Sequence, residues 1–403
     1  SDLSKVPGRI LDRKMVRTFR PDIRLVEEQF EMVQYVEKGR KPRWGYFPRE
    51  GHPQVVPRFD GTKITPGFLQ AIAYEVYVKN VTFGLLHRWL GDMGMSVSEN
   101  TLRNWLKKGK GYLDRMVVEL KRIALEKDAV VNCDETWCKV RKYDCYKKCY
   151  MWVLVNKAER VVIFFCEDGS RGRDVLTNFL GDAELKSLMS DGYNAYVFIG
   201  NELRTDKYRD TDHQVCLAHV RAKFVKARME GGDRRADVFL DNINRLFRFE
   251  REYDREMITD EERTRRRQGL PTLEAMINLR ANLLQELKND EGQKSCYMQE
   301  TLNYLHKFWK EAFTYIKDGR YPISNNLAER AVRPFTTKRK NSLHFGSDEG
   351  AEIAAVYHCI ISTVKLQGGS AWDYLGKFFT GIFNGCRDFL SPSPQNIDLA
   401  VCK

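Results

Sequence analysis

An apolar run ends in acidic residues at Ala129-Val130-Val131-Asn132-Cys133-Asp134-Glu135-Thr136, and another ends at Asp191 in Leu185-Lys186-Ser187-Leu188-Met189-Ser190-Asp191. Either acid alone is typical of a turn or a cap. A third acid, Glu329, opens a basic stretch of helical pattern over 325–334. Two strand-end carboxylates and one helix carboxylate offer oxygen ligands to a pair of hard cations. Two such ions about 3.5–4 Å apart bind the attacking and leaving oxygens of a phosphodiester, so the pattern indicates metal-dependent nucleic-acid cleavage or strand transfer.

The segments around these acids predict an α/β core. Strands are expected over 129–134, 149–155, 160–167, 185–190 and 214–218, with a helix over 173–180 and a short helix after Gly192. Three strands, a helix, a strand, a helix and a strand is the order of a ribonuclease-H-like core. Sites in open α/β sheets form at the carboxyl ends of strands, where Asp134 and Asp191 are expected to lie.

The composition is that of a folded, basic chain. Of 403 residues, 42% are hydrophobic, and 67 Lys and Arg against 55 Asp and Glu give a net charge of +12. This length predicts about two to four domains. The basic excess favours a nucleic-acid partner, although it also suits an acidic protein surface. No apolar run reaches membrane-spanning length, so no membrane association is expected.

The N-terminal part divides into a basic arm, 1–60, and a helical region, 61–126. Short strands or turns are expected around 46–56. Helices are expected from Pro66, over 82–93 and over 101–108, followed by a connector helix over 111–125. A helix, a turn with Gly94 and a second, basic helix are typical of a helix-turn-helix DNA-binding region, although any small helical bundle shows this pattern. Leu102 and Trp105 are expected in the core, and the predicted DNA contacts are Arg103, Asn104, Lys107 and Lys108.

A highly charged helical insertion is predicted over 219–321. The Arg-rich stretch 245–267 predicts a solvated helix face with internal ion pairs. A second long amphipathic helix is expected over 272–288. Trp309 suits a core position at helical spacing. The alternative is a stacking platform for an unpaired base, worth about 1–3 kcal/mol, and on that interpretation Trp309 is a DNA-binding candidate.

With these motifs in place, the chain resembles bacterial transposases of the insertion-sequence 66 group, which carry a DDE catalytic domain. The similarity extends from about residue 62 to 380. The most specific stretch begins at Asp318-Gly319-Arg320 and continues through Asn325-Asn326-Leu327-Ala328-Glu329-Arg330 to Gly350. The other matching stretches are 134–136, 191–196 and 216–224.

The resemblance implies that Asp134, Asp191 and Glu329 are catalytic, metal-binding acids on a ribonuclease-H-like fold, with Mg²⁺ as cofactor and Mn²⁺ as a substitute. It implies a divided core, 127–218 and 322–380, around the insertion 219–321, and a tail over 381–403. The implied partners are double-stranded DNA (transposon ends and target), a second copy of the chain on DNA and small accessory proteins of the same element. The implied location is the bacterial cytoplasm, at the nucleoid.

One departure from the family concerns zinc. Family members carry an N-terminal zinc-binding cysteine cluster, often after a leucine-zipper-like segment, whereas the first 132 residues here contain no cysteine. The ten cysteines of the chain do not follow paired CxxC or Cys/His spacing. Zinc binding is therefore not expected, and part of the usual N-terminus is expected to be missing from this sequence.

The Cys216-x-x-His219 motif leaves three interpretations open. It is half of a zinc site without an evident second half, or a strand-end thiol with a helix-capping imidazole. By resemblance to other transposases with insertions, His219 is instead a catalytic residue beside the scissile phosphate.

The choice of the third acid also has alternatives. Glu135, Asp348, Glu349 and Glu352 are rivals, with Glu352 as the runner-up. Glu329 is preferred because the neighbouring cations would hold DNA at the metals. A structural pairing needs fewer cations than this stretch contains, so phosphate contacts are predicted for Arg330, Arg333, Lys338, Arg339 and Lys340.

The sequence therefore predicts a DNA transposase that binds transposon ends and catalyses metal-dependent strand cleavage and strand transfer. One alternative is a nuclease of the same fold without strand transfer. Another is a non-catalytic DNA-binding protein derived from a transposase, against which the presence of all three acids counts.

Overall fold

The computed structural model describes residues 33–36, 40–45, 64–142, 145–204, 206–289 and 294–386. The turns predicted around 46–56, and most of the predicted arm and tail, lie outside these residues. The chain separates into two units, 1–55 with 87–98 and 56–86 with 99–403. In the first unit, β1 (Val33–Tyr35) and β2 (Arg43–Gly45) form an antiparallel pair that was not predicted. Helix α2 (Phe83–Asp92), predicted over 82–93, has residues in both units.

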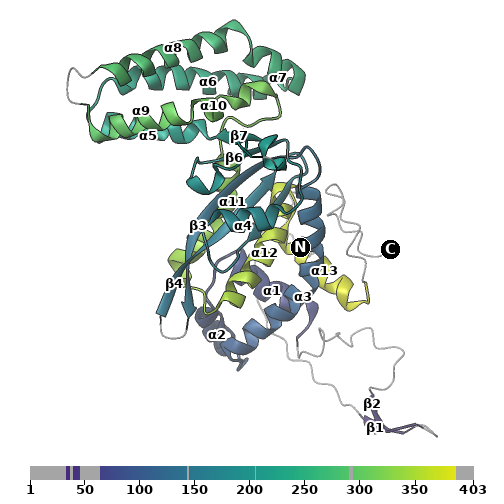
Figure 1. Cartoon of the computed structure of the whole chain (residues 1–403). Helices are drawn as coiled ribbons and strands as arrows, with labels where there is room; N and C mark the ends of the chain where they lie inside the picture. Colours follow the sequence, from purple (N-terminus) through teal and green to yellow (C-terminus); the bar gives the residue numbers. More distant parts are fainter. Residues whose placement is uncertain are drawn as a thin grey trace, which may run out of the picture. The chain divides into compact units, whose positions relative to one another are not determined.

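The second unit contains a mixed five-stranded sheet in the order β5-β4-β3-β6-β7 (Figure 1). Its strands are β3 (Val130–Lys142), β4 (Cys145–Asn156), β5 (Val161–Phe165), β6 (Ser187–Ser190) and β7 (Asp212–Val215). β3, β4 and β5 are antiparallel neighbours, whereas β6 is parallel to β3 and β7 is parallel to β6. A strand is present at each of the five predicted places, and the α/β class is confirmed.

The prediction that the first strand ends at Asp134 is wrong, because β3 continues to Lys142. Beyond the acidic pair, buried Cys138 and Val140 alternate with exposed Trp137 and Lys139. This period of two is typical of a strand with one covered face. Asp134 consequently lies inside β3, although it lies just beyond the part of β3 that pairs with β6.

The outer edge of the sheet at β5 is covered by α12 (Asp348–Leu366). The backbone N–H groups of Val162 and Phe164 donate to Thr363 Oγ1 and Cys359 Sγ, at 3.0 Å each. The same two side chains donate back to the carbonyl oxygens of these residues. The edge strand therefore finds hydrogen-bond partners within the chain, which protects it from pairing with another molecule.

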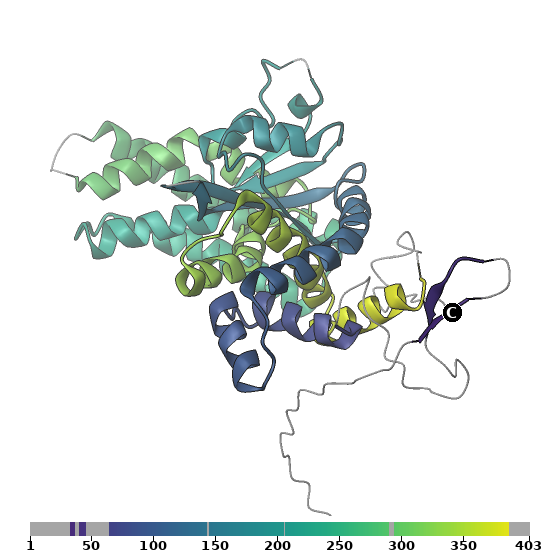
Figure 2. The ribbon, with the colours of Figure 1, turned by 90° about the horizontal axis from the view of Figure 1, so that it is seen from below.

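A helical layer built from distant segments packs beside the sheet. It contains α1 (Pro66–Tyr77), α3 (Glu99–Ala124), α12 and α13 (Ala371–Phe383), and Figure 2 shows the early helices beside the yellow α13. The rings of Tyr77 and Tyr357 stack with centroids 4.4 Å apart. The predicted break between a third helix and a connector helix is wrong, since α3 is continuous. Gly109 lies inside this helix. A larger residue does not fit there, because a Cβ would approach Tyr357 Oη to 2.4 Å.

Short elements connect β5 to β6 and β6 to β7. The predicted helix over 173–180 is α4 (Arg173–Leu180), whose Phe179 ring stacks on Phe165 at 3.6 Å between centroids. The predicted short helix after Gly192 is a single 3-10 turn, η3 (Asn194–Tyr196), and a second such turn, η4 (Lys207–Arg209), precedes β7. These elements return the chain to β6, the parallel neighbour of β3, and then to β7, the parallel neighbour of β6.

Helices with a hydrophobic core of their own follow β7 (green in Figure 1). They are α5 (Leu217–Met229), α6 (Ala236–Glu256), α7 (Asp260–Arg267), α8 (Leu270–Lys288), α9 (Cys296–Lys307), α10 (Trp309–Ala312) and the 3-10 turn η5 (Thr314–Lys317). Phe224 and Phe239 stack at 4.5 Å in that core. Many charges pair on the surface as predicted, but Arg267 is 1% exposed and donates to Glu250. The expectation of a wholly solvated face is therefore wrong at Arg267.

Candidate functional site

Asp134 and Asp191 lie on neighbouring parallel strands of the sheet. β3 and β6 pair Val130 with Ser187 and Asn132 with Met189. The same offset, continued by two residues, brings Asp134 level with Asp191. Asp191 follows the last residue of β6, where its carbonyl oxygen accepts a 2.6 Å hydrogen bond from Tyr304 Oη of α9.

Glu329 reaches the same place because one buried amide fixes α11 (Asn326–Ser342) to β3. Asn325, which is 0% exposed, donates from Nδ2 to the carbonyl oxygen of Cys133 at 2.8 Å and accepts from Asn132 Nδ2 at 2.9 Å. Its backbone N–H donates to Cys216 Sγ at 3.1 Å. Glu329 lies one helical turn later, and its N–H donates to the Asn325 carbonyl oxygen. We call this arrangement of Asn325, Asn132, Cys133 and Cys216 the Asn325 junction.

The charges of the other acids act on Asp134. Burial, first, and the negative charges of Glu135, Asp191 and Glu329 raise the pKa of Asp134 to about 8. The N–H of Glu135, which donates to Asp134 Oδ1 at 2.9 Å, acts in the opposite direction. Carboxylates that repel one another in a partly buried cleft are stabilised by a cation between them. An all-oxygen donor set of this kind fits Mg²⁺ or Mn²⁺.

His219 and Cys216 lie directly beside Glu329. His219 is in the first turn of α5, and its Nδ1 is 3.6 Å from Glu329 Oε1. That distance is too long for a hydrogen bond, and the buried Nδ1 has no hydrogen-bond partner among the described residues. Burial raises the pKa of the Cys216 thiol to about 11. Of the interpretations left open for this motif, a helix-capping imidazole finds no support among the described residues, because His219 Nδ1 has no hydrogen-bond partner and no side chain of the N-cap residue bonds to α5.

The rival third acids have other surroundings. Glu135 accepts from Arg171 Nη2 and from Tyr196 Oη, both at 2.6 Å, so its carboxylate is held on the protein. Glu349 forms an ion pair with Lys107. The runner-up, Glu352, lies with Asp348 at a cavity of about 270 Å³ that also exposes the side chains of Cys138, Cys149 and Cys166. Burial raises the pKa of Cys166, and the negative charge of Glu352 raises it further. Glu352 is not among the charges that raise the pKa of Asp134.

The five cations after Glu329 lie in three different environments. Arg330, Arg333 and Lys340 are exposed, and within the described ranges they take part in no ion pair. Arg339 donates to the Trp137 carbonyl oxygen at 2.9 Å, and its guanidinium lies 3.9 Å from the Trp137 ring centroid.

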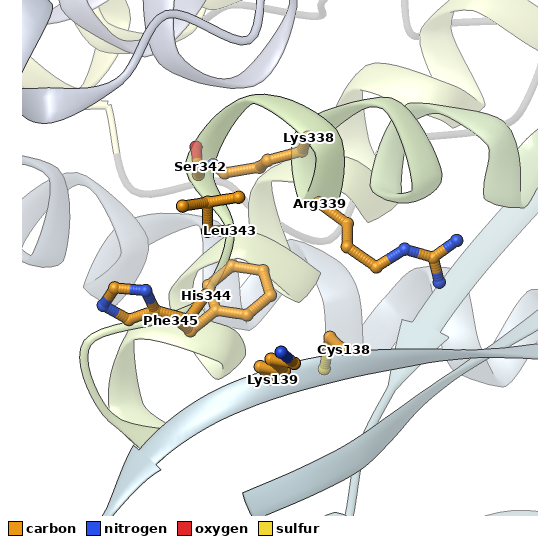
Figure 3. Close-up of a pocket in the computed structure, with 8 residues that line it drawn as sticks. All are labelled: Cys138, Lys139, Lys338, Arg339, Ser342, Leu343, His344 and Phe345. Carbon is orange, nitrogen blue, oxygen red and sulfur yellow. The ribbon is translucent and has the colours of Figure 1, made fainter. Parts of the chain in front are cut away.

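Lys338 is the exception, since it is 6% exposed and its Nζ lies 4.2 Å from the Tyr77 ring centroid. Figure 3 shows Lys338 and Arg339 leaving α11 in different directions above Cys138 and Lys139 of β3. Burial lowers the pKa of Lys338 to about 7. This burial conflicts with the phosphate contact predicted for Lys338.

The predicted helix-turn-helix side chains divide as expected at α3. Leu102 and Trp105 are buried, and the four predicted DNA contacts are exposed. Arg103 pairs with Glu99 at 2.6 Å and lies over the Phe83 ring. Trp309 is half-buried against the helical core, with its ring 4.4 Å from that of Phe313.

Sequence reasoning missed the residues that position the acids. Asn325 lies inside the most specific motif of the sequence, but sequence reasoning did not expect its side chain to be buried. An Asn before a helix is usually a cap. Here its side chain makes no cap bond to its own helix. Tyr196 and Arg171, which hold Glu135, had no sequence pattern that could have identified them.

A protein family and several curated proteins are similar to this chain. A family model described as "Transposase IS66 family" matches residues 61–353. The uncharacterized protein y4qI of Sinorhizobium fredii (strain NBRC 101917 / NGR234) is 24% identical over 363 residues, which cover 86% of this chain and 65% of that protein. The uncharacterized protein y4jD of the same organism is 28% identical over 198 residues, covering 49% of this chain and 38% of that protein. The chain thus spans less than two thirds of the length of these curated relatives. None of the helices in the described ranges is long and apolar enough to span a membrane.

Proposed function

Since the chain belongs to the IS66 transposase family, we propose that it is a DDE transposase that cleaves DNA at transposon ends and joins the freed 3′ ends to target DNA. The observation that supports this proposal concerns Asp134, Asp191 and Glu329, which come from two strands and a helix far apart in sequence. The parallel register of β3 and β6 aligns Asp134 with Asp191, the Asn325 junction holds the start of α11 on β3, and the charges of Asp191 and Glu329 act on Asp134.

We propose that the sheet is a ribonuclease-H-like core. The support is its order, with three antiparallel strands followed by two parallel ones on the inner side of the first. On this proposal the core comprises 127–218 and 322–380, the helices over 219–321 are an insertion, and 61–126 is a helix-turn-helix DNA-binding region. The arm, 1–60, and the tail, 381–403, flank these parts.

Asp134, Asp191 and Glu329 would hold Mg²⁺, or Mn²⁺ in its place. When bound, such ions activate the attacking oxygen and stabilise the leaving oxygen of a phosphodiester. The protein contributes position, because the N–H groups of Glu135 and Tyr193 donate to the carboxylates of Asp134 and Asp191. His219, beside Glu329, is placed to contact the scissile phosphate.

Arg330, Arg333 and Lys340 are proposed to bind the DNA strand that is cut. Their exposure and lack of ion pairs in the described part of the chain leave these charges for phosphate. Arg339 of α11, whose guanidinium lies over the ring of Trp137 in β3, would support this surface. The α3 residues Arg103, Asn104, Lys107 and Lys108 are proposed to enter a groove of the transposon end. A stacking role of Trp309 on a base stays a prediction.

A cleavage assay with transposon-end DNA and Mg²⁺ tests the proposal. Asp134→Asn, Asp191→Asn and Glu329→Gln should each abolish cleavage and leave DNA binding intact, whereas Glu352→Gln, the matched control, should cleave normally. Joined products with target DNA distinguish a transposase from a nuclease of the same fold. Binding without cleavage by the wild-type chain at any divalent cation concentration would identify a non-catalytic DNA-binding protein instead.

A further inference from the structure

A second donor set lies at the junction of β7 and α5, where Cys216, His219 and Glu329 meet. Each residue offers one ligand atom, and these atoms all lie within 4.8 Å of one another. The sequence contains only Cys216-x-x-His219, which is half of a zinc motif. The fold supplies a third ligand from α11, more than a hundred residues further along the chain.

The sulfur of this set is fixed in place by the packing of two helices. Cys216 is 0% exposed and is the residue before the first turn of α5. Its Sγ accepts from the Asn325 N–H, at the start of α11, at 3.1 Å. This N–H and the N-terminus of α5 favour negative charge on the sulfur and act against burial, so a cation that replaces the thiol proton would complete the site.

The imidazole of His219 is incompletely bonded without an ion. Its Nδ1 is buried and has no hydrogen-bond partner among the described residues, and the Glu329 carboxylate is 3.6 Å away. Buried polar atoms in proteins are normally hydrogen-bonded or bound to an ion. A cation shared by this nitrogen, the Glu329 carboxylate and the Cys216 sulfur would satisfy it.

The chemistry of the donors selects the ion. Sulfur, imidazole nitrogen and a carboxylate oxygen together are the ligands of Zn²⁺, which accepts three protein ligands and a water molecule. Mg²⁺ prefers oxygen and does not bind thiolate. We propose that Cys216, His219 and Glu329 form a Zn²⁺ site that withdraws Glu329 from the carboxylate cluster and thereby blocks Mg²⁺-dependent cleavage. Binding displaces the thiol proton to solvent. The blocking effect rests on the proposed function, whereas the binding does not.

Cobalt substitution tests the binding directly. The full chain, titrated with Co²⁺, should develop one thiolate-to-cobalt charge-transfer band in the near ultraviolet, and Zn²⁺ should displace it at one ion per chain. Cys216→Ala should abolish the band, and His219→Gln should weaken Co²⁺ binding about tenfold or more. Cys296→Ser, which removes an exposed thiol outside the donor set, and Asp191→Asn should keep the band. Because His219 is half-exposed, its variant remains informative if Cys216→Ala does not fold.

The blocking effect is measured separately. With Mg²⁺ constant, Zn²⁺ should inhibit end cleavage, and Cys216→Ala should require about tenfold more Zn²⁺ for the same inhibition. Absence of a charge-transfer band, its persistence in Cys216→Ala, or full cleavage with Zn²⁺ bound would each overturn the proposal. A chain that binds Co²⁺ through Cys216 but never cleaves DNA would refute the proposed function and leave the metal site standing.

Discussion

Replacing Asn325 with Ala tests whether the Asn325 junction positions the site. The substitution removes both the donor to the Cys133 carbonyl oxygen and the acceptor of Asn132 Nδ2. A buried polar group that loses its partner costs about 1–3 kcal/mol. Asn132 Nδ2 keeps a longer bond of 3.4 Å to the Ser324 carbonyl oxygen, so the free energy of unfolding should fall by the cost of one such group, about 1–3 kcal/mol, out of the roughly 5–15 kcal/mol typical of a folded protein.

The loss of cleavage should exceed what this destabilisation explains. Urea unfolding gives the free-energy change, and single-turnover cleavage of end DNA at low temperature gives the rate while the chain is still folded. Glu329 lies one turn from the junction, so a small displacement of α11 removes it from the two aspartates. We expect a rate loss of about 100-fold or more with DNA binding retained.

The neighbouring Asn326→Ala is the matched control, because Asn326 is exposed at the first position of α11. It should change the free energy of unfolding by no more than about 0.5 kcal/mol and leave the rate unchanged. If Asn325→Ala unfolds and cleaves like Asn326→Ala, the junction does not position Glu329, and the reasoning is refuted.

Three further predictions concern the basic residues. Arg333→Ala should lower both DNA affinity and cleavage, with a smaller loss at low salt. Arg333→Lys should restore affinity better than the cleavage rate, because ammonium lacks the planar two-point contact with phosphate. Normal DNA binding by the Ala variant would contradict this prediction. Removing both Lys107 and Lys108 should reduce the salt dependence of DNA binding by about 0.9 per lost phosphate contact, and an unchanged slope in a salt titration would place DNA elsewhere. Lys338 has a folded pKa of about 7, below its unfolded value, so the unfolded chain binds its proton more tightly and stability should rise from about pH 7 to 10. Urea midpoints of wild type and Lys338→Met compared across that range check this, since the variant should lack this part of the rise.

The strands and helices were predictable where their hydrophobic period was strong. The helix over 173–180 was placed correctly, and a strand was found at each of five expected positions. The length of β3 was not predicted, because Asp134 and Glu135 interrupt its apolar pattern and resemble a turn. The continuity of α3 was missed because Gly109 breaks helices in isolation, whereas Tyr357 here requires the small residue.

Sequence reasoning proposed the three acids of the candidate site, which stay a prediction, but it did not identify the residues that position them. Strand order places Asp134 near Asp191, which follows from rules of sheet topology. The position of Glu329 depends on hydrogen bonds between Asn132 and Asn325, a contact that no local pattern contains. Likewise, Lys338 stands among four other cations in the sequence, and its packing against Tyr77 of α1 and Phe345 could not be read from that pattern.

The contact between Asn132 and Asn325 spans 193 positions of the chain, which has a consequence for biosynthesis. Strands β3 and β6 leave the ribosome long before Glu329 is translated, so two of the three acids exist for many seconds without the third. A nascent or prematurely terminated polypeptide therefore has no complete set of carboxylates. Since contacts distant in sequence also form late in folding, the DNA cleavage proposed for this chain would be withheld until nearly the whole chain is made and folded.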